Sequence, residues 1–421
     1  MRGRFSSDGL SMASKRTTVR DLRRHNRSLL LSKLYFDGPL SRHELSQLTG
    51  LSAATVSNVT AELAEEQLIT EAGQVESDGG RPRVLLRVDP GYGHVAGVDI
   101  GETGVKVELF DLAMNRLAAA DYPVSSERPD PEDTVRRMTS GLLEVVSEAG
   151  IEDETVLGVG IGVPGTVEQG ERILVHAPTV GWDAVPLAEL LQEAGVPYPL
   201  FIDNGAKTQG QAEMWFGAGR GTKHAVIALI GSGVGAAVVT DGTTYRGSTS
   251  SAGEWGHTTL IYGGLECRCG SRGCLEAYAG AEGILARYRK ARGRTADDAD
   301  EQTQFAALLN GRSKTAAKIL DETAGYLGAG IANLINLFNP ERIVLGGWAG
   351  LALGRTLLPR IREAAGAHAL RHPFSQTDIR LGQLGLDAVA IGAATLPVAD
   401  LLEQGATSRV SKPGAPDSDA A

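Results

Sequence analysis

The chain has 421 residues, 42% of them hydrophobic, with a formal net charge of −10 at pH 7, so it can form two or three domains with buried cores. Its longest uncharged stretch, residues 225–240, is interrupted by glycines and is shorter than the roughly twenty apolar residues of a membrane span. We expect no secretory signal, because the start is polar and basic. The cysteine count of 3 favours the reducing cytoplasm.

Positive charge is concentrated at the N-terminus. Residues 1–60 contain ten lysines and arginines against four aspartates and glutamates, so the remainder is strongly acidic. A basic end on an acidic protein indicates that this end alone meets a polyanion. The alternative is a disordered basic tail, which we predict for residues 1–20.

Residues 21–90 are predicted to form a helix-turn-helix followed by a hairpin. Apolar residues at helical spacing predict a first helix over about 22–36. Ser41 and Glu44 form a capping box that opens a second helix, in which Leu45 and Leu48 are expected to point inward.

A glycine-containing turn leads to a third helix that starts near Ser52. Its apolar stripe is Val56, Val59 and Leu63, and short polar residues near its start are expected to face the major groove of DNA. A three-helix bundle without a DNA role is the alternative. The candidate DNA-binding residues on this helix are Ser52, Ala53, Thr55, Ser57 and Asn58.

Two β-rich runs, residues 68–71 and 84–88, flank a glycine-rich tip at 77–83. This pattern predicts the wing of a winged helix-turn-helix, with Arg81 and Arg83 directed at phosphates or a narrow minor groove. A simple hairpin turn is the alternative.

Beyond residue 93, buried strands alternate with glycine turns in the order found in the actin-like ATPase and sugar-kinase superfamily, which the chain resembles. Each motif alone is weak, since glycine after a strand is most often a turn device. Inherited strand-turn geometry is our preferred interpretation, and retained nucleotide binding stays open. The loop residues are Asp99, Gly101, Thr103, Lys106, Gly231, Gly233, Gly235, Gly346 and Gly347.

All cysteines fall within one short glycine-containing loop, just after a histidine. Thiolates and an imidazole are the donors that tetrahedral zinc prefers. The sequence therefore predicts a structural Zn²⁺ site with the ligands His257, Cys267, Cys269 and Cys274.

This loop, with the glutamates on either side of it, resembles the signature of the ROK family of bacterial sugar kinases and sugar-responsive repressors. The resemblance covers roughly residues 93–400, and the glycine-rich tip at 77–83 is also similar to the wing of ROK repressors. It implies that sugar hydroxyls are held by Asn204, Glu254, His257 and Glu276. The histidine can bind metal through one ring nitrogen and face the sugar with the other.

The kinase base is absent from the matching motif. Kinases of this family carry a catalytic aspartate where this chain has Gly205, and glycine cannot accept a proton. Loss of a positioned base costs about 10²- to 10⁴-fold in rate. Asp203 lies two residues away, roughly 6.6 Å along an extended segment, which is beyond proton-transfer reach.

The resemblance implies an α/β fold in which a winged helix-turn-helix at 21–90 precedes a two-lobed actin-like body with a zinc loop. The first lobe is expected at 93–203 plus 386–402 and the second at 204–385, with a disordered tail at 405–421. Together these features predict a cytoplasmic, sugar-responsive transcriptional regulator, most simply a repressor of carbohydrate genes. It would bind palindromic operator DNA as a dimer or tetramer, respond to a small sugar or sugar phosphate, and contact no membrane.

Two alternatives remain open at this stage. An active ROK sugar kinase with an accessory DNA-binding module predicts ATP turnover. A ligand-independent DNA-binding protein predicts operator binding that no sugar affects. An activator is also compatible with the sequence.

Overall fold

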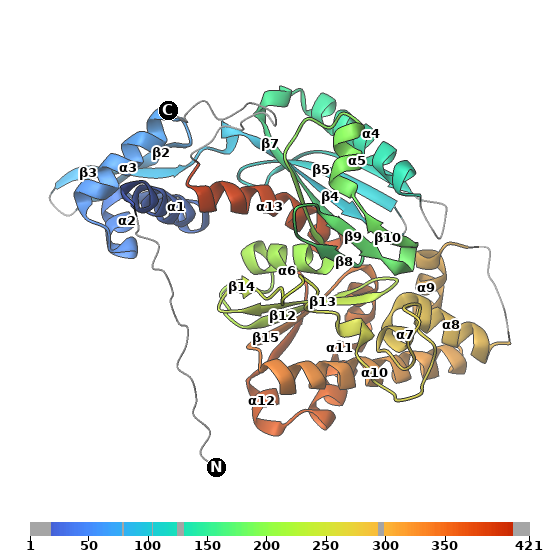
Figure 1. Ribbon diagram of the computed structural model, residues 1–421. Coiled ribbons are helices and arrows are strands. Elements are labelled where there is room, and N and C mark those ends of the chain that lie inside the picture. Colours follow the sequence, from blue (N-terminus) through green and yellow to red (C-terminus); the bar gives the residue numbers. More distant parts are fainter. Residues whose placement is uncertain (1–17, 78–79, 103, 124–129, 294–298, 407–421) are drawn as a thin grey trace, which may run out of the picture. The chain divides into compact units, whose positions relative to one another are not determined.

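The computed structural model describes residues 18–77, 80–102, 104–123, 130–293 and 299–406, without the side chains of residues 77, 80 and 81. The predicted tails lie almost entirely outside these ranges, as does Thr103. The chain divides into two compact units, residues 1–89 with 400–421 and residues 90–399. Each unit is described separately below (Figure 1).

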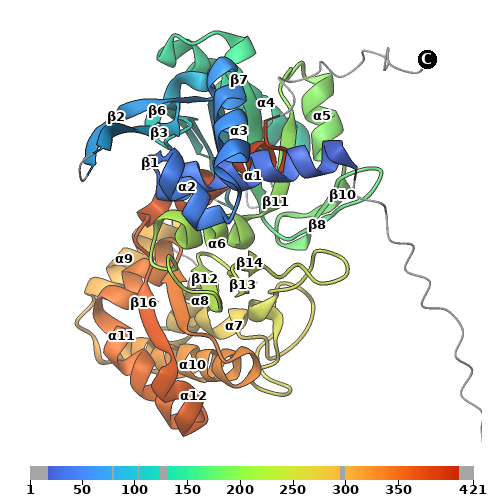
Figure 2. The same ribbon diagram turned by 90° about the vertical axis from the view of Figure 1, so that its left-hand side faces the viewer.

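The described residues 18–89 of the N-terminal unit form three helices followed by a hairpin (Figure 2). The predicted capping box is confirmed, because Ser41 N donates to Glu44 Oε2 at 2.7 Å and Glu44 N donates to Ser41 Oγ at 3.3 Å. A left-handed Gly50, with φ of 70°, ends the second helix. The elements are α1 Val19–Asp37, β1 Leu40–Ser41, α2 Arg42–Thr49, α3 Ala53–Glu65, β2 Ile69–Ser77 and β3 Gly80–Val88.

The core of this unit follows the predicted apolar pattern with one exception. Leu45 and the stripe of α3 are buried, but Leu48 is 52% exposed, so the expectation that it points inward was wrong. Leu48 lies three residues beyond Leu45 on a helix of only 8 residues, whose buried residues include Leu45 alone. A short helix on the surface buries a narrower stripe than the spacing suggests.

The hairpin is longer than the sequence indicated. Strands β2 and β3 continue to the pair Ser77 and Gly80, so Arg83 lies within β3, opposite Val75, rather than in a wide tip. The register shifts around Gly73, which has a φ of 108°. A glycine at positive φ allows a bulge that keeps the strands paired beyond it.

Arg27 is the one long cationic side chain buried among the described residues of α1, with 2% exposure. Its Nη1 and Nη2 donate to Glu66 Oε1 and Oε2 at 2.9 and 2.5 Å, and its Nε donates to Gly405 O at 2.8 Å. Because Gly405 follows the last helix of the chain, this arginine joins α1, α3 and the C-terminal segment within the unit.

We expect Arg27→Ala to destabilise this unit by on the order of 2–3 kcal/mol, because a buried carbonyl and a carboxylate lose their donor. Arg23→Ala is the matched control. Arg23 pairs with Glu62 at 2.9 Å but is 62% exposed, so its loss should cost less than about 1 kcal/mol. Amide hydrogen exchange of α1 and α3 measures both, and equal effects would contradict the buried-arginine argument.

The second unit contains two five-stranded mixed sheets with the same strand plan and a small antiparallel sheet of residues 166–185. In the first lobe the order is β11-β7-β4-β5-β6, and in the second it is β14-β13-β12-β15-β16. In each, an antiparallel set of three strands is followed by two parallel strands. Hydrophobic strand-turn-strand runs in both halves of the sequence account for this repetition.

Helices cover the outer faces of both sheets (Figure 1). The first lobe comprises β4 His94–Ile100, β5 Gly104–Asp111, β6 Arg116–Pro123, α4 Pro131–Ala149, β7 Val156–Val163, β8 Thr166–Glu168, β9 Leu174–Ala177, β10 Trp182–Val185, α5 Leu187–Glu193 and β11 Leu200–Asn204. The second comprises α6 Gly205–Phe216, β12 Ala225–Ile230, β13 Val234–Thr240, β14 Thr243–Thr244, α7 Glu276–Ala279, α8 Ala281–Ala291, α9 Glu301–Asn310, α10 Lys314–Phe338, β15 Arg342–Gly346, α11 Trp348–His368, α12 Arg371–Gln376 and β16 Asp378–Leu381.

Helix α13, Ala388–Gln404, lies with α6 between the two sheets (Figure 1). Its backbone approaches the first sheet at glycines, since a Cβ on Gly97 would lie 2.0 Å from Ala390 O and one on Gly160 would lie 1.7 Å from Ala393 O. Residues 385–404 are long and apolar enough to cross a membrane, but 56% of that window is buried inside the fold. A core helix explains its composition.

Candidate functional site

A cavity of about 830 Å³ opens beside the carboxyl ends of the central strands of both lobes, where open α/β sheets bind ligands. The four predicted sugar-binding residues, Asn204, Glu254, His257 and Glu276, all line it. The described loop residues also line it, except Gly346. A Cβ on Gly346 would lie 2.6 Å from the Gln209 side chain, so close packing explains that glycine.

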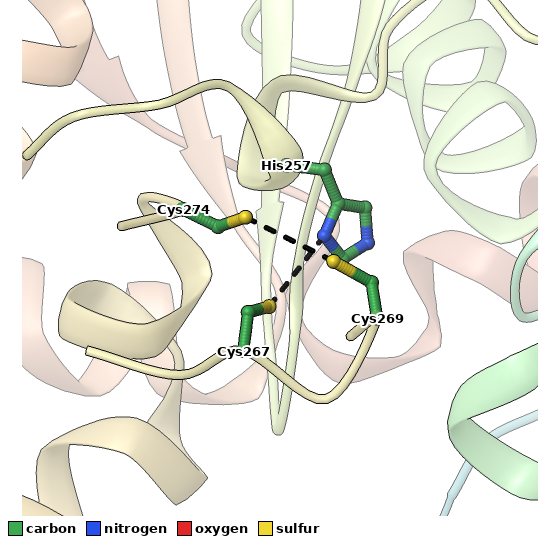
Figure 3. A group of neighbouring side chains, drawn as sticks. All are labelled: His257, Cys267, Cys269 and Cys274. Atoms are coloured by element: carbon green, nitrogen blue, oxygen red, sulfur yellow. Dashed lines mark hydrogen bonds between the residues drawn. The ribbon is translucent and has the colours of Figure 1, made fainter. Parts of the chain in front are cut away.

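The predicted metal ligands come together in one cluster (Figure 3). Their donor atoms all lie within 4.8 Å of one another. Cys269 Sγ is 3.8 Å from Cys274 Sγ, and Cys267 Sγ is 3.7 Å from His257 Nδ1. Two sulfurs bound to one tetrahedral ion at about 2.3 Å lie about 3.8 Å apart. The donor set and its spacing therefore fit a bound metal ion.

For two of the three cysteines, the protein environment alone disfavours the thiolate form that binds a metal. Burial raises the pKa of Cys267 and of Cys274. A divalent cation would offset that cost, since metal binding deprotonates its cysteine ligands. His257 directs Nδ1 toward the cluster (Figure 3), so its other ring nitrogen is available to the cavity.

Glu254 and Glu276 differ in how their carboxylates are held. Glu276 Oε2 accepts a hydrogen bond from Val234 N at 2.9 Å, which fixes it at the start of α7. Glu254 accepts none from the part of the chain that the structure describes, and burial raises its pKa. A half-buried carboxylate with open lone pairs is suited to accept hydrogen bonds from ligand hydroxyls.

Asn204 links the cavity to α6. Its Oδ1 accepts from Ala206 N at 2.9 Å and Lys207 N at 3.2 Å, and its Nδ2 donates to Gly165 O at 2.5 Å. The side chain therefore caps the helix. Sequence reasoning gave this asparagine only a ligand role, although a residue before a helical run also has the signature of an N-cap.

Gly205 lines the cavity directly after this cap. A Cβ built there would meet Val163 O and a Val389 methyl, each at 3.6 Å, so the position has space for a side chain and the chain provides none. Asp203 is buried and pairs with Arg246 at 2.5 Å. It does not line the cavity, so Asp203 does not take the place of the missing carboxylate at Gly205.

The loops that resemble phosphate loops make their own internal contacts. Gly231 N donates to Gly233 O at 2.9 Å, and a Cβ on Gly233 would lie 2.5 Å from Glu276 Oε2. Gly233 is thus explained by its approach to a carboxylate. Glu102, in the first loop, accepts two hydrogen bonds from Arg268 of the cysteine loop, at 2.6 and 3.1 Å.

Sequence reasoning missed the Glu102 and Arg268 pair. Both are charged residues inside glycine-containing loops, which is a signal that each has a specific partner. The two residues are 166 positions apart in the sequence, so only the fold shows that they are partners.

Asp99 lines the cavity on β4, opposite Lys106 of β5. Burial raises the pKa of Asp99 from 3.8 to about 7. Because the unfolded chain loses this proton at lower pH than the folded protein does, the contribution of this group to the free energy of unfolding is highest below pH 3.8. It falls as the pH rises through about 7. We expect Asp99→Asn to remove this loss, so its advantage in unfolding free energy grows between pH 4 and 8 to on the order of 3 kcal/mol. Thermal unfolding at pH 5 and pH 8 measures it, and an advantage that shrinks with pH would contradict it.

The candidate DNA-binding residues occupy one end of α3. Ser52 is the N-cap, with its Oγ accepting from Thr55 N at 3.1 Å. Ala53, Ser57 and Asn58 are exposed, whereas Thr55 is half-buried. Arg83 is exposed on β3, and the side chain of Arg81 lies outside the described residues.

Two lobes of one strand plan, around a cavity that carries acidic and amide side chains, define a sugar-kinase-like protein of the actin-like class. A sequence model of the ROK family matches residues 95–399. The chain belongs to the ROK family, as its cysteine loop indicated.

Three similar proteins represent the two branches of the family. The xylose repressor of Caldicellulosiruptor bescii is 30% identical over 390 residues, covering 90% of this chain and 97% of the relative. The glucokinase of Halalkalibacterium halodurans is 33% identical over 311 residues, covering 71% and 93%. The crystal structure of a ROK family transcriptional regulator, a homologue of the E. coli MLC protein, aligns with a TM-score of 0.76 and 25% identity over 91% of this chain and 98% of that one.

Proposed function

We propose that the chain is a carbohydrate-responsive transcriptional repressor. One observation carries the proposal: a helix-hairpin unit with an exposed polar helix start belongs to the same chain as a sugar-kinase-like cavity that has Gly205 where the kinases have their base. The xylose repressor matches over 90% of the chain and the glucokinase over 71%, which also supports the repressor branch.

The N-terminal unit supplies the DNA-binding surface in this proposal, as a winged helix-turn-helix. Helix α3 would enter the major groove with its first turns, where Ser57 and Asn58 are exposed. The β2–β3 hairpin would contact the backbone through Arg83, and through Arg81 at its tip. A dimer or tetramer would place two such units on a palindromic operator.

The cavity supplies the effector site. Glu254, His257, Glu276 and Asn204 would hold the hydroxyls of a sugar. We propose that the ion of the cysteine cluster is Zn²⁺, which prefers these donors. When bound, it would fix the loop between His257 and Glu276. The sugar would change operator affinity only through its different affinities for the DNA-competent and DNA-incompetent arrangements.

The proposed location is the cytoplasm, where operator DNA and a reduced cysteine cluster are both found. Helix α13 is accounted for as a core helix, so no membrane contact enters the proposal.

We expect no phosphoryl transfer. In a coupled assay of ADP release with glucose, xylose or N-acetylglucosamine, the rate should be at least about 10²-fold below that of the H. halodurans glucokinase under the same conditions, since glycine stands where the kinases have their positioned base. Turnover comparable to that enzyme would instead favour the alternative, a sugar kinase with an accessory DNA module.

The proposal is tested by selecting bound sequences from a random DNA library with the full-length, zinc-loaded protein. We expect a palindromic site with half-sites about one helical turn or a multiple of it apart. Sugars are then added to the selected complex in a gel-shift titration. Release of the DNA by one sugar supports the repressor. Failure to select any sequence would reject DNA binding, and binding that no sugar alters would reject the effector role.

A further inference from the structure

We infer that the carbohydrate recognised by this cavity is uncharged, and that the cavity discriminates against sugar phosphates. The inference rests on the proposed sugar-sensing function and adds the chemical class of the ligand. It follows from the partners of the cationic side chains that line the cavity.

Among the described lining residues, Lys106 and Arg268 carry permanent positive charge, and carboxylates already neutralise both. The guanidinium of Arg268 binds both oxygens of Glu102, at 2.6 and 3.1 Å, and its Nε lies 2.9 Å from Glu282 Oε2. Lys106 Nζ lies 2.6 Å from Asp387 Oδ1. Two-point pairs of this kind are among the strongest hydrogen bonds in proteins, so a phosphate would have to displace a carboxylate to reach either cation.

The imidazoles of the lining are also engaged. His176 Nε2 lies 3.1 Å from Glu168 Oε2, and its Nδ1 lies 3.6 Å from Asp183 Oδ1. His257 directs Nδ1 to the cysteine cluster (Figure 3). Once that nitrogen binds a metal, the ring is a neutral donor toward the cavity, which suits a hydroxyl.

Two carboxyl groups of the lining are open to a ligand. Glu254 is held by no hydrogen bond from the described ranges, and Asp99 is a second carboxyl of the same cavity. A hydroxyl can donate to either, whereas the oxygens of a phosphate only accept at neutral pH. Like charges placed together at a binding site oppose binding strongly.

Helix N-termini are the remaining features that attract anions. The start of α6 is capped by Asn204 Oδ1, which uses the amides of residues 206 and 207. The start of α11 has no side-chain cap, and Gly347 and Trp348 line the cavity there. Its partial charge is smaller than the full charge of a carboxylate, so the cavity as a whole favours a neutral ligand.

The test is a set of calorimetric titrations of the full-length, zinc-loaded protein with matched pairs: glucose and glucose 6-phosphate, N-acetylglucosamine and its 6-phosphate, and xylose alone. We expect an uncharged sugar to bind, and each phosphate to bind at least about tenfold more weakly than its parent sugar. A phosphate that binds more tightly than its parent would overturn the inference and leave the sensing function standing. If no probe binds a protein that still binds its operator, both fail.

A variant distinguishes the effect of charge on phosphate binding from the effect of cavity shape. Glu102→Gln removes the carboxylate that occupies Arg268, so the preference for the parent sugar over its phosphate should fall by about fivefold or more. Glu193→Gln, an exposed change on α5 that removes one negative charge outside the cavity, should keep the wild-type ratio. Zinc content and thermal midpoint verify folding. An unchanged ratio in Glu102→Gln would reject the role of this pair.

Discussion

Cys267→Ser should prevent binding of the proposed zinc ion, lower the thermal midpoint and abolish the proposed sugar response. The hydroxyl of serine is a poor replacement for a thiolate, and we expect zinc affinity to fall by more than about 100-fold. Cys267 lies 3.7 Å from His257 Nδ1 and 3.7 Å from Glu276 Oε1, so its loss also disturbs two proposed sugar ligands. Metal analysis, thermal unfolding and the operator-release titration measure the three effects.

Arg272→Ala is the control for that change. Arg272 is exposed on the same loop and contributes no donor to the cluster, so the variant should keep its ion and its sugar response. If Cys267→Ser or chelation removes the ion while sugar still releases DNA as in the wild type, the metal does not organise the sugar site. That result would leave the ion with a purely local structural role.

Glu254→Gln should weaken sugar binding by about 10- to 100-fold, the usual value of a hydrogen bond to a charged group. Operator affinity without sugar should stay at the wild-type value, because Glu254 lies in the cavity and not in the N-terminal unit. The fold should be slightly stabilised, since burial raises the pKa of Glu254 and the neutral amide avoids that cost. Calorimetry measures the sugar affinity and a gel shift measures the operator affinity, both with the same sugar.

The matched change is Glu266→Gln, on the exposed part of the same loop. This change also removes one negative charge from the loop. It should leave the sugar affinity and the operator affinity unchanged. Equal losses in the two variants would indicate a general effect of charge, and an unaltered sugar affinity in Glu254→Gln would remove this carboxylate from the site.

The metal cluster could be predicted because its ligands are close in the sequence. Cysteine spacing within one tight loop leaves few geometries, and the donor atoms of His257, Cys267, Cys269 and Cys274 do converge. The helices of the N-terminal unit could be predicted for a similar reason. A cap such as Ser41 with Glu44 joins residues only three positions apart. Such a local contact can therefore be predicted without knowledge of the tertiary fold.

Features that depend on distant partners could not be predicted. Arg27 reads as one more charge in a basic segment, yet its partner Gly405 is 378 residues away. The pairing of Glu102 with Arg268 could not be predicted for the same reason, since these residues are 166 positions apart. Leu48 and the hairpin tip show a second limit, since periodicity gives a residue's face but not how much of that face a neighbour covers.

The close backbone contacts of α13, at two glycines of the first sheet and one of its own, have a consequence for mutational tolerance. At Gly97, Gly160 and Gly392 an added methyl group would overlap a backbone oxygen of Ala390, Ala393 or Thr208 at 2.0 Å or less. Backbone atoms cannot change rotamer to make room, so even alanine should be rejected there. A saturation screen for regulation would therefore score these three positions as strictly as the cavity itself, although none of them is among its lining residues. Positions that tolerate no substitution in this protein therefore include sites of close backbone packing as well as sites of ligand contact.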